Sequence, residues 1–373
     1  MVKISIIFGT RPEIIKLALL IKLFKETPQV DLNVCFTGQH KEMVIPLLNF
    51  FNIQTDHSLN IMQPDQTLAG ISSTSLKAID EYYDIVKPNL VFVQGDTSTA
   101  LNAAIAAFYK KIKIAHVEAG LRTYDLDSPF PEEFNRQVIS KIASLNFAPT
   151  ELSKDNLINE HILSNKIFIT GNTVIDSLLY TIEKLKQKPI ELTNKFKFLK
   201  DDLPFILVTM HRRENFGDSI QHVCEALKEL SQLFPDYNFI YPVHLNPNVQ
   251  EPVYRLLKNI NNIFLIDPLD YIDFTYLMSK CYLILSDSGG VQEEAPSLGK
   301  PLLILRENTE RSEVLEVGAA KLIGTNKEVI IKEVKKLIED KSTYEKMSNC
   351  INPFGDGEAS KRIVRDTLNY MKA

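Results

Sequence analysis

Residues 3–25 read KISIIFGTRPEIIKLALLIKLFK, and this stretch decides the fold class. Lys3–Phe8 is a short apolar run rich in isoleucine, which is typical of a strand buried on both faces. A Gly-Thr turn follows, and over Glu13–Lys25 apolar residues recur at three- and four-residue spacing, as on one face of a helix. The stretch therefore predicts a strand, a turn and a helix, the repeating unit of α/β proteins.

The same alternation continues through both halves of the chain. Stretches such as Thr67–Val86 and Ser98–Tyr109 have helical spacing and lie between short apolar runs. Because alternating strands and helices form parallel sheets covered on both faces, we expect an α/β fold of Rossmann-like, doubly wound domains. The further strands expected are Leu32–Thr37, Leu90–Gln94, Lys113–Glu118, Asn146–Ala148, Lys166–Thr170, Phe205–Thr209, Phe239–Val243, Ile263–Ile266, Tyr282–Ser286 and Pro301–Leu305.

The length of 373 residues and one pause in the alternation predict two domains. The pause follows Gly171, where the chain is helical and then charged and loop-like up to Leu203. We place an N-terminal domain at 1–171 and a C-terminal domain at 172–357. A last helix at 358–373 follows a glycine-rich breaker and can join the N-terminal domain.

The composition excludes several classes of protein. A net charge of −5 argues against a general nucleic-acid or membrane-surface binder, so an anionic ligand needs a local cluster of basic groups. The four cysteines form no Cys-x-x-Cys pair, as in a protein with reduced thiols. The N-terminus enters a strand at once without a signal peptide, and the longest apolar run, Ile14–Phe24, is too short to span a membrane. We expect a cytoplasmic protein.

Polar, glycine-rich turns follow most of the expected strands. Ligands of open α/β sheets bind at the carboxyl ends of the strands, so these turns predict one shared cleft. Each turn also has a simpler explanation: a glycine is often only a turn residue, Glu118 and Arg122 can be a surface pair, and His244 can cap a helix. Ser288–Gly290 is the strongest signal, because free N–H groups at a helix start bind phosphate. The turns are Gly9–Glu13 with Lys16, Gly95–Ser98, Glu118–Arg122, His211–Asn215, His244 and Asp287–Gly290.

The motifs of common cofactor sites are missing. The first turn is not Gly-x-Gly-x-x-Gly, and Arg11 and Pro12 occupy the place where a dinucleotide would approach the backbone. The sequence contains no GxxxxGK[ST] loop and no HExxH or similar metal-ligand spacing. We therefore expect neither a cofactor nor a metal.

The chain resembles the family of non-hydrolysing UDP-N-acetylglucosamine 2-epimerases from its first strand to its last helix. No single motif decides this resemblance, but together the motifs are highly specific. They are Gly9–Glu13 with Lys16, Thr37–His40, Gln94–Thr97, His116–Arg122, Pro131–Arg136, His211–Asn215, Ser286–Pro301 (SDSGGVQEEAPSLGKP) and Thr309–Arg311.

The resemblance implies a fold like that of the two-domain GT-B glycosyltransferases, with the active site in the interdomain cleft. UDP is expected mainly on the C-terminal domain, with the diphosphate at Ser288–Gly290, the ribose at Glu294 and the uracil near Phe274, while the sugar faces the N-terminal domain. The implied catalytic residues are Asp96, Glu118, Glu132 and His211. The implied substrate-binding residues are Arg11, Lys16, Phe274, Ser288, Gly289, Gly290, Glu294 and Arg311.

The reaction of this family interconverts UDP-N-acetylglucosamine and UDP-N-acetylmannosamine, to supply surface polysaccharide synthesis. The C2 proton is not next to a carbonyl, so no ordinary base removes it directly. Elimination of UDP to a 2-acetamidoglucal solves this problem, because positive charge at C1 acidifies the C2 proton. Such a reaction needs acid–base groups on both faces of C2 and cations for the departing diphosphate. We assign proton transfer to Asp96 and Glu132, and contacts with the sugar hydroxyls to Glu118.

Members of the family also bind a second UDP-N-acetylglucosamine that activates the enzyme. Some members have glutamine where this chain has Glu42 and arginine where it has Asp65. Two acidic side chains facing a diphosphate weaken its binding, so we expect this activation to be impaired. The matching positions are Gln39, Glu42, Asp65, Gln66, Glu132, Arg212 and His244.

Three other functions compete with this one. A retaining UDP-sugar glycosyltransferase often has two glutamates eight positions apart, whereas the positions eight after Glu293 and Glu294 are Pro301 and Leu302. A hydrolysing or uronic-acid-specific 2-epimerase would share most motifs. A catalytically silent UDP-sugar sensor would not need the carboxylates. The family also implies a homodimer.

Overall fold

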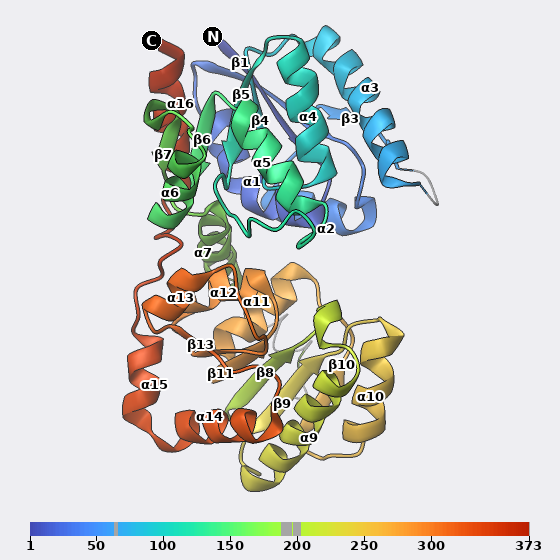
Figure 1. The fold of residues 1–373 in the computed structure, drawn as a ribbon, viewed down its shortest axis with the longest axis vertical. Helices are drawn as coiled ribbons and strands as arrows, with labels where there is room; N and C mark the ends of the chain where they lie inside the picture. Colours follow the sequence, from blue (N-terminus) through green and yellow to red (C-terminus); the bar gives the residue numbers. More distant parts are fainter. Residues whose placement is uncertain (63–65, 188–195, 197–202, 373) are drawn as a thin grey trace. The chain divides into compact units, whose positions relative to one another are not determined.

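The computed structural model describes residues 1–62, 66–187, 196 and 203–372, and the chain forms two compact units (Figure 1). Unit 1 comprises Met1–Ser177 and Phe354–Ala373, and unit 2 comprises Leu178–Pro353. Each unit contains one parallel sheet with helices packed against it. The predicted fold class, two doubly wound α/β domains, is confirmed.

Unit 1 is built on a seven-stranded sheet in the order β3-β2-β1-β4-β5-β6-β7, with every pairing parallel. The strand order reverses direction beside β1, and in such sheets ligands bind where this reversal occurs. The strands are β1 (Val2–Phe8), β2 (Val30–Phe36), β3 (His57–Ser58), β4 (Leu90–Gln94), β5 (Lys113–Val117), β6 (Leu145–Ala148) and β7 (Ile167–Ile169).

Helices α1 and α4 pack on the sheet of unit 1 through largely apolar buried residues, whereas most buried residues of α5 are polar or charged. In α4 the buried residues are mostly alanines, including Ala100, Ala103, Ala104 and Ala107, all fully buried, and α4 packs between α3 and α5. The helices are α1 (Arg11–Lys25), α2 (Lys41–Phe51), α3 (Leu68–Val86), α4 (Ser98–Tyr109), α5 (Glu132–Ile142), α6 (Glu151–Asn159), η1 (Ser164–Lys166) and α16 (Ala359–Lys372). Helix α7 (Thr173–Lys186) begins in unit 1 and continues into unit 2 after Ser177.

Unit 2 repeats the plan with six parallel strands in the order β10-β9-β8-β11-β12-β13. Its strands are β8 (Phe205–Thr209), β9 (Asn238–Pro242), β10 (Ile263–Ile266), β11 (Leu283–Ser286), β12 (Leu302–Ile304) and β13 (Ala320–Leu322). Its helices are η2 (Arg213–Asn215), α9 (Asp218–Leu233), α10 (Pro247–Leu257), α11 (Tyr271–Lys280), α12 (Gly289–Glu294), η3 (Ala295–Leu298), α13 (Ser312–Glu316), α14 (Lys327–Glu339) and α15 (Lys341–Ser348).

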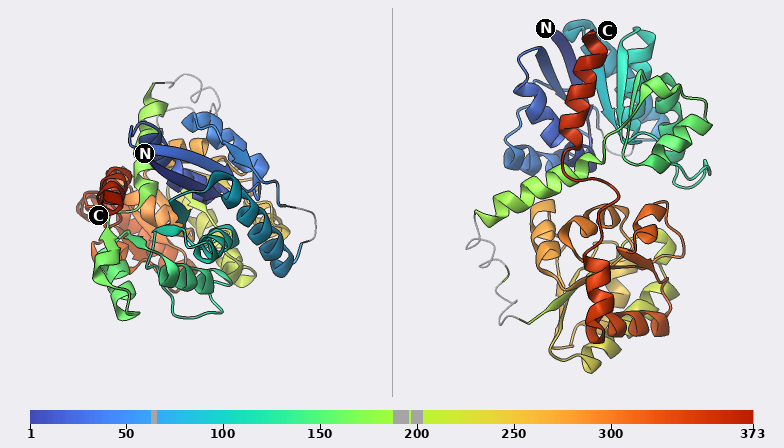
Figure 2. Two further views of the ribbon diagram at one scale, coloured as in Figure 1. Left: turned by 90° about the horizontal axis from the view of Figure 1, so that it is seen from above. Right: turned by 90° about the vertical axis from the view of Figure 1, so that its left-hand side faces the viewer.

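The final helix α16 belongs to unit 1, where it packs on α1 (Figure 2). The Asn172 N–H donates to the Phe354 carbonyl (2.6 Å), and the Asp176 carboxylate accepts from the N–H groups of Ala359 and Ser360 (3.3 and 2.7 Å). These bonds place residues 172–177 and 354–357 in unit 1, whereas we expected them in the second domain.

None of the four cysteines is paired in a disulfide. Cys35, Cys224 and Cys281 are buried, Cys350 is partly exposed, and all four thiols are free. Within the described ranges, no helix combines the length and the apolar character that crossing a bilayer requires.

Candidate active site

The turn after β1 is shaped by Glu13, a residue we did not single out. Its fully buried carboxylate accepts hydrogen bonds from the N–H groups of Gly9 (3.0 Å) and Thr10 (2.7 Å) and from the Thr97 hydroxyl (2.7 Å). Burial raises the pKa of Glu13, although these donors oppose the change. Glu13 therefore ties the turn after β1 to the turn after β4. The sequence signal was a glutamate three positions after a helix-capping threonine.

Glu118, directly after β5, is held by a cation and an amide. Lys16 Nζ lies 2.5 Å from Glu118 Oε2, and Gln94 Nε2 donates to the same oxygen. The Lys16 and Glu118 side chains are 15% and 8% exposed, so the ion pair is largely shielded from water. Glu118 also has a left-handed backbone (φ +65°), which is uncommon for a residue with a side chain and often occurs at functional sites. The structure thus brings together two predicted site residues, Lys16 and Glu118.

Asp96, after β4, contacts a buried arginine. Arg136 Nε lies 3.1 Å from Asp96 Oδ2, and Arg136 Nη2 donates to the same oxygen. Arg136 Nη1 lies 3.3 Å from Glu133 Oε2, so one guanidinium joins two carboxylates. The Asn135 side-chain amide also donates to the Asp96 carbonyl (2.7 Å). Asp96 itself is 27% exposed, so its carboxylate can reach a ligand.

His116 supports the Asp96 turn from inside the sheet. It is fully buried, and its Nε2 lies 2.7 Å from the Gly95 carbonyl. Burial lowers the pKa of His116 to about 3, so the ring is neutral at physiological pH. A neutral ring that bonds a carbonyl carries its proton on Nε2, which makes His116 a hydrogen-bond donor to the turn.

Glu132 begins α5, after a loop with cis peptide bonds before Pro129 and Pro131. It is partly exposed, and across the described ranges its carboxylate has no hydrogen-bond or ion-pair partner. Helix α5 also carries Arg136, so Glu132 shares an element with the residue that contacts Asp96.

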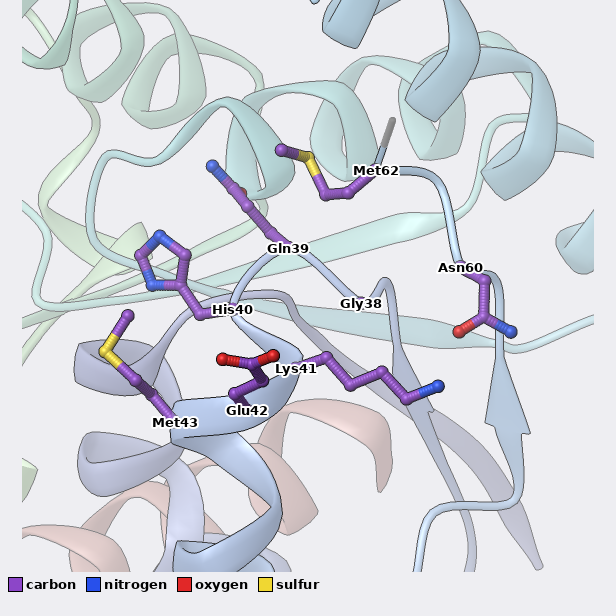
Figure 3. Close-up of a pocket in the computed structure, with 8 residues that line it drawn as sticks. All are labelled: Gly38, Gln39, His40, Lys41, Glu42, Met43, Asn60 and Met62. Carbon is purple, nitrogen blue, oxygen red and sulfur yellow. The ribbon is translucent and has the colours of Figure 1, made fainter. Parts of the chain in front are cut away.

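A hollow of about 560 Å³ lies beside the turn after β2 in unit 1 (Figure 3). Gln39 and Glu42, two of the predicted regulatory residues, are among its lining residues. Gln39 accepts from the Thr99 hydroxyl (3.0 Å), and Gln66 donates to the Ile61 carbonyl (3.3 Å). The residues that line the hollow are Gly38, Gln39, His40, Lys41, Glu42, Met43, Asn60 and Met62.

Two further regulatory and binding predictions concern the same part of unit 1. Asp65 lies outside the described residues. Arg11 is exposed at the first position of α1. The pKa of His40 is lowered first by the burial of His40 and then by the positive charge of Arg11. Arg11 is therefore close enough to the hollow for its charge to act on a lining residue.

In unit 2, the buried Asp287 organises the turn after β8. Its carboxylate accepts from the N–H groups of His211 (3.0 Å) and Arg212 (2.8 Å) and from the Asn215 amide (3.0 Å). His211 Nδ1 lies 3.4 Å from the other Asp287 oxygen. Asp287 is fully buried, and these contacts compensate the cost of burying its charge. It fixes two predicted site residues, His211 and Arg212, although we had not assigned it a role.

The rings of His211 and His244 stack with their centroids 5.9 Å apart. His244 is exposed, and its Nδ1 accepts the Asn246 N–H (3.2 Å), a contact within the turn that precedes α10. Asn246, not His244, therefore caps α10, and the His244 ring lies beside a predicted site residue.

The start of α12 carries Ser288, Gly289 and Gly290 next to a fixed cation. Arg311 Nε lies 2.7 Å from Glu293, and its Nη1 lies 2.5 Å from Glu310. A methyl group at Gly289 would lie 2.7 Å from Arg311 Nη1, so only glycine permits this approach. The structure thus brings the predicted residues Ser288, Gly289 and Arg311 together.

Carboxylates hold this arginine in place. Burial opposes ionisation of Glu310, but the adjacent Arg311 and Arg306 outweigh it and lower its pKa to about 2. Glu310 therefore stays ionised, and Arg311 keeps its position through charge-assisted hydrogen bonds.

The last two predicted residues lie on neighbouring elements of unit 2. Glu294 ends α12 and is 7% exposed, while Phe274 is half-buried on α11. Burial raises the pKa of Tyr271, also on α11, and the charge of Glu294 adds to this effect. Glu294 therefore acts electrostatically on the helix that carries Phe274.

Comparison with known proteins identifies relatives over nearly the full chain. A family model described as UDP-N-acetylglucosamine 2-epimerase matches residues 22–367. The UDP-N-acetylglucosamine 2-epimerase of Campylobacter jejuni is 53% identical over 369 residues, covering 97% of this chain and 96% of that protein. The Escherichia coli K12 protein of that name is 46% identical over 370 residues, covering 98% of both.

Solved structures agree. The Neisseria meningitidis UDP-GlcNAc 2-epimerase bound to UDP-GlcNAc matches with a TM-score of 0.93 and 47% identity, covering 98% of this chain and 100% of that chain. The Methanocaldococcus jannaschii UDP-GlcNAc 2-epimerase in complex with UDP-GlcNAc and UDP matches with a TM-score of 0.83 and 39% identity, covering 99% of both chains.

Proposed function

This chain belongs to the UDP-N-acetylglucosamine 2-epimerase family, and on this premise we propose that it interconverts UDP-N-acetylglucosamine and UDP-N-acetylmannosamine without hydrolysis. The observation that carries the proposal is the set of carboxylates in unit 1. Asp96 and Glu118 follow neighbouring strands, and each is held by a cation that is largely shielded from water. A protein that only bound UDP-sugars would not need these groups.

The reaction that we propose begins with cleavage of the bond between C1 and the UDP oxygen. The bonding electrons leave with UDP, C1 becomes electron-poor, and a base removes the C2 proton to give 2-acetamidoglucal. UDP then adds back to C1 while a proton arrives at the opposite face of C2. No electron is gained or lost overall, so the reaction is a balanced isomerisation.

We assign proton transfer to Asp96 and Glu132 of unit 1. Asp96 keeps an exposed fraction of 27% despite its ion pair, and Glu132 is at the partly exposed start of α5. A positioned carboxylic acid or carboxylate contributes about 10²–10⁴-fold to such a step. Glu118, already bound to Lys16, is suited to contact sugar hydroxyls.

We assign UDP binding to unit 2. Gly289 and Gly290 offer backbone N–H groups at a helix start, where a diphosphate is favoured, and His211 and Arg311 add donors for the departing charge. Ser288 can contribute its hydroxyl, because its own N–H donates to the Ser286 hydroxyl (3.0 Å). Preorganisation supports this role, because Asp287 fixes the His211 turn and Glu293 and Glu310 fix Arg311. We place the ribose at Glu294 and the uracil near Phe274.

We also propose that activation by a second UDP-N-acetylglucosamine is impaired in this chain. The hollow beside the turn after β2 includes Gln39 and Glu42, and the Glu42 carboxylate would repel a diphosphate there. The measurement is turnover of pure UDP-N-acetylmannosamine. Turnover that starts only after trace UDP-N-acetylglucosamine is added would show that activation is intact.

A homodimer is supported by exposed apolar side chains on unit 1. Ile85, near the C-terminal end of α3, is 72% exposed. Phe108 and Tyr109, the last two residues of α4, are 54% and 70% exposed. Helices α3 and α4 pack together, and exposed apolar side chains of this kind are common in protein interfaces. Light scattering of the protein and of Phe108→Glu tests this assignment.

We expect the product to supply surface polysaccharide synthesis in a reducing, cytoplasmic compartment, which the four free thiols suit.

Incubation in deuterated water separates the competing functions. We expect deuterium at C2 of both UDP-sugars, with UDP still attached, by proton NMR. Released free N-acetylmannosamine would instead indicate a hydrolysing enzyme, and transfer of the sugar to an acceptor would indicate a glycosyltransferase. Binding without exchange would indicate a sensor and would refute the proposal.

A further inference from the structure

We propose that Arg136 and Glu133 are positioning residues that set the direction of the Asp96 carboxylate and its separation from Glu132. This inference rests on the proposed function, which assigns proton transfer to Asp96 and Glu132. Neither Arg136 nor Glu133 needs to touch the substrate for this role, because both act through the residues they hold.

The contact between Arg136 and Asp96 engages one oxygen only. Arg136 Nε lies 3.1 Å from Asp96 Oδ2, and Nη2 donates to that same oxygen. Over the described ranges, Asp96 Oδ1 has no hydrogen-bond partner. One edge of the guanidinium therefore fixes the carboxylate, while its second oxygen stays available to a reacting proton.

Glu133 in turn fixes Arg136. Its fully buried carboxylate accepts from the N–H groups of Thr123 (3.0 Å) and Tyr124 (3.1 Å), from the Gln137 amide (2.8 Å) and from Arg136 Nη1 (3.3 Å). Burial opposes its ionisation, but these donors outweigh burial and lower the pKa of Glu133. A guanidinium with 7% exposure cannot leave this pair without stranding a buried charge.

Helix α5 connects the pair to Glu132. Glu132 is the first residue of α5, Glu133 is the second, and Arg136 lies one turn further along the same helix. The Asn135 amide adds a bond to the Asp96 carbonyl (2.7 Å). Two contacts therefore join the first turn of α5 to the end of β4, one to the backbone of Asp96 and one to its side chain. The two proton-transfer carboxylates are fixed relative to each other by groups that carry no proton to the sugar.

Inversion at C2 makes this spacing matter. The base and the acid must face opposite sides of one carbon, and a displacement of about 1 Å can reduce a rate about 100-fold. The alternative is that Arg136 and Glu133 only stabilise unit 1, as many buried ion pairs do. A positioning role predicts that substitution changes the face of C2 to which the proton returns, whereas a purely stabilising role predicts no such change.

Unit 1 contains a matched control for this distinction. Arg122 Nε lies 2.6 Å from Glu160 Oε1 and Nη2 lies 3.1 Å from Oε2, with the Arg122 side chain fully buried. This ion pair is buried like the one at Arg136, although it engages both oxygens of its carboxylate. Among the described residues, none of its hydrogen bonds or ion pairs goes to Asp96, Glu118 or Glu132. Arg122→Lys therefore reports the cost of weakening a buried arginine pair alone.

The experiment compares Arg136→Lys, Glu133→Gln and Arg122→Lys in deuterated water. For Arg136→Lys we expect kcat to fall about 100-fold with KM nearly unchanged, and for Glu133→Gln about tenfold. In both variants the recovered UDP-N-acetylglucosamine should gain deuterium faster than product forms, because misplaced groups return the proton to the original face. This ratio counts only active molecules, so a loss of stability alone leaves it unchanged.

The outcomes separate this proposal from the proposed function. An unchanged kcat in Arg136→Lys, or an equal loss in Arg122→Lys with the parental exchange ratio in both, would overturn the positioning role. If Arg136→Lys does not fold, the ratio in Glu133→Gln decides in the same way. Absence of deuterium at C2 with the parent enzyme would overturn the proposed function, and the positioning role with it.

Discussion

Unit 1 and unit 2 share the order of six strands, to which unit 1 adds β7, but they carry different groups at their strand ends. In unit 1, the carboxylates of Asp96 and Glu118 lie at the strand ends, and the buried Arg136 and the largely shielded Lys16 hold them. In unit 2, the imidazole of His211 and the guanidinium of Arg311 are presented and buried carboxylates hold them. The shared fold therefore does not determine the chemistry of either unit, which depends on the residues at each turn.

The comparison suggests a division of labour between acid–base catalysis and leaving-group binding. The strongest test of this division is to remove one carboxylate from unit 1. Asp96→Asn cannot exchange a proton, so we expect kcat to fall about 10³-fold, while UDP binds about as well as before. Turnover assays and calorimetric titration with UDP measure the two effects. An equal loss of UDP affinity would show that the two functions are not divided.

The converse change removes the carboxylate that organises unit 2. Asp287→Asn weakens three hydrogen bonds to a charged acceptor, each worth about 1.5–3 kcal/mol. We expect UDP affinity to fall about 100-fold, by calorimetry. Asp340→Asn serves as a control, because Asp340 caps α15 in the same unit. If the control loses as much affinity, Asp287 has no special role.

A smaller change tests the glycine beside Arg311. In Gly289→Ala the new methyl group would lie 2.7 Å from the guanidinium, which must move, whereas at Gly290 it would meet only the Ser288 hydroxyl at 4.0 Å. We expect Gly289→Ala to weaken UDP binding about tenfold, roughly 1.4 kcal/mol, and Gly290→Ala to weaken it less. The reverse order in competition binding would contradict a role for Arg311 in holding the diphosphate.

The smallest effect concerns stability. Burial lowers the pKa of His116 from 6.5 to about 3, so its stabilising contribution is complete above pH 6.5 and decreases as the pH falls toward 3. Between pH 7.5 and 5.0, the free energy of unfolding should fall about 2 kcal/mol more in the parent than in His116→Gln. Urea unfolding at both values measures the difference. Equal slopes would show that His116 is not buried as a neutral ring.

The bounds of several strands and of one helix could be predicted from the sequence. Strands β4, β8 and β10 and helix α4 begin and end where the apolar pattern predicted. Strands β3 and β13 were missed because two and three residues are too few to show a period. The boundary between the units, after Ser177, lies within the pause after Gly171, and its exact position depends on hydrogen bonds between distant segments.

The candidate site could be predicted one turn at a time. The turns that carry Lys16, Asp96, Glu118 and Ser288 were identified, because glycine and charge together mark the ends of buried strands. The residues that hold these groups were not assigned roles. Arg136 lies 40 residues after Asp96, and Asp287 lies 76 residues after His211, so these contacts exist only in the folded chain.

The return of the chain to unit 1 at Phe354 has a consequence for how the protein is made. Helix α16 is capped by Asp176, which is synthesised 183 residues before Ala359. During translation, every residue of unit 2 is therefore added before unit 1 receives its last helix. Domains tend to fold as they emerge from the ribosome, so unit 2 has time to fold while unit 1 is still incomplete. Because unit 2 is inserted into unit 1, the synthesis of unit 1 begins first and is completed last.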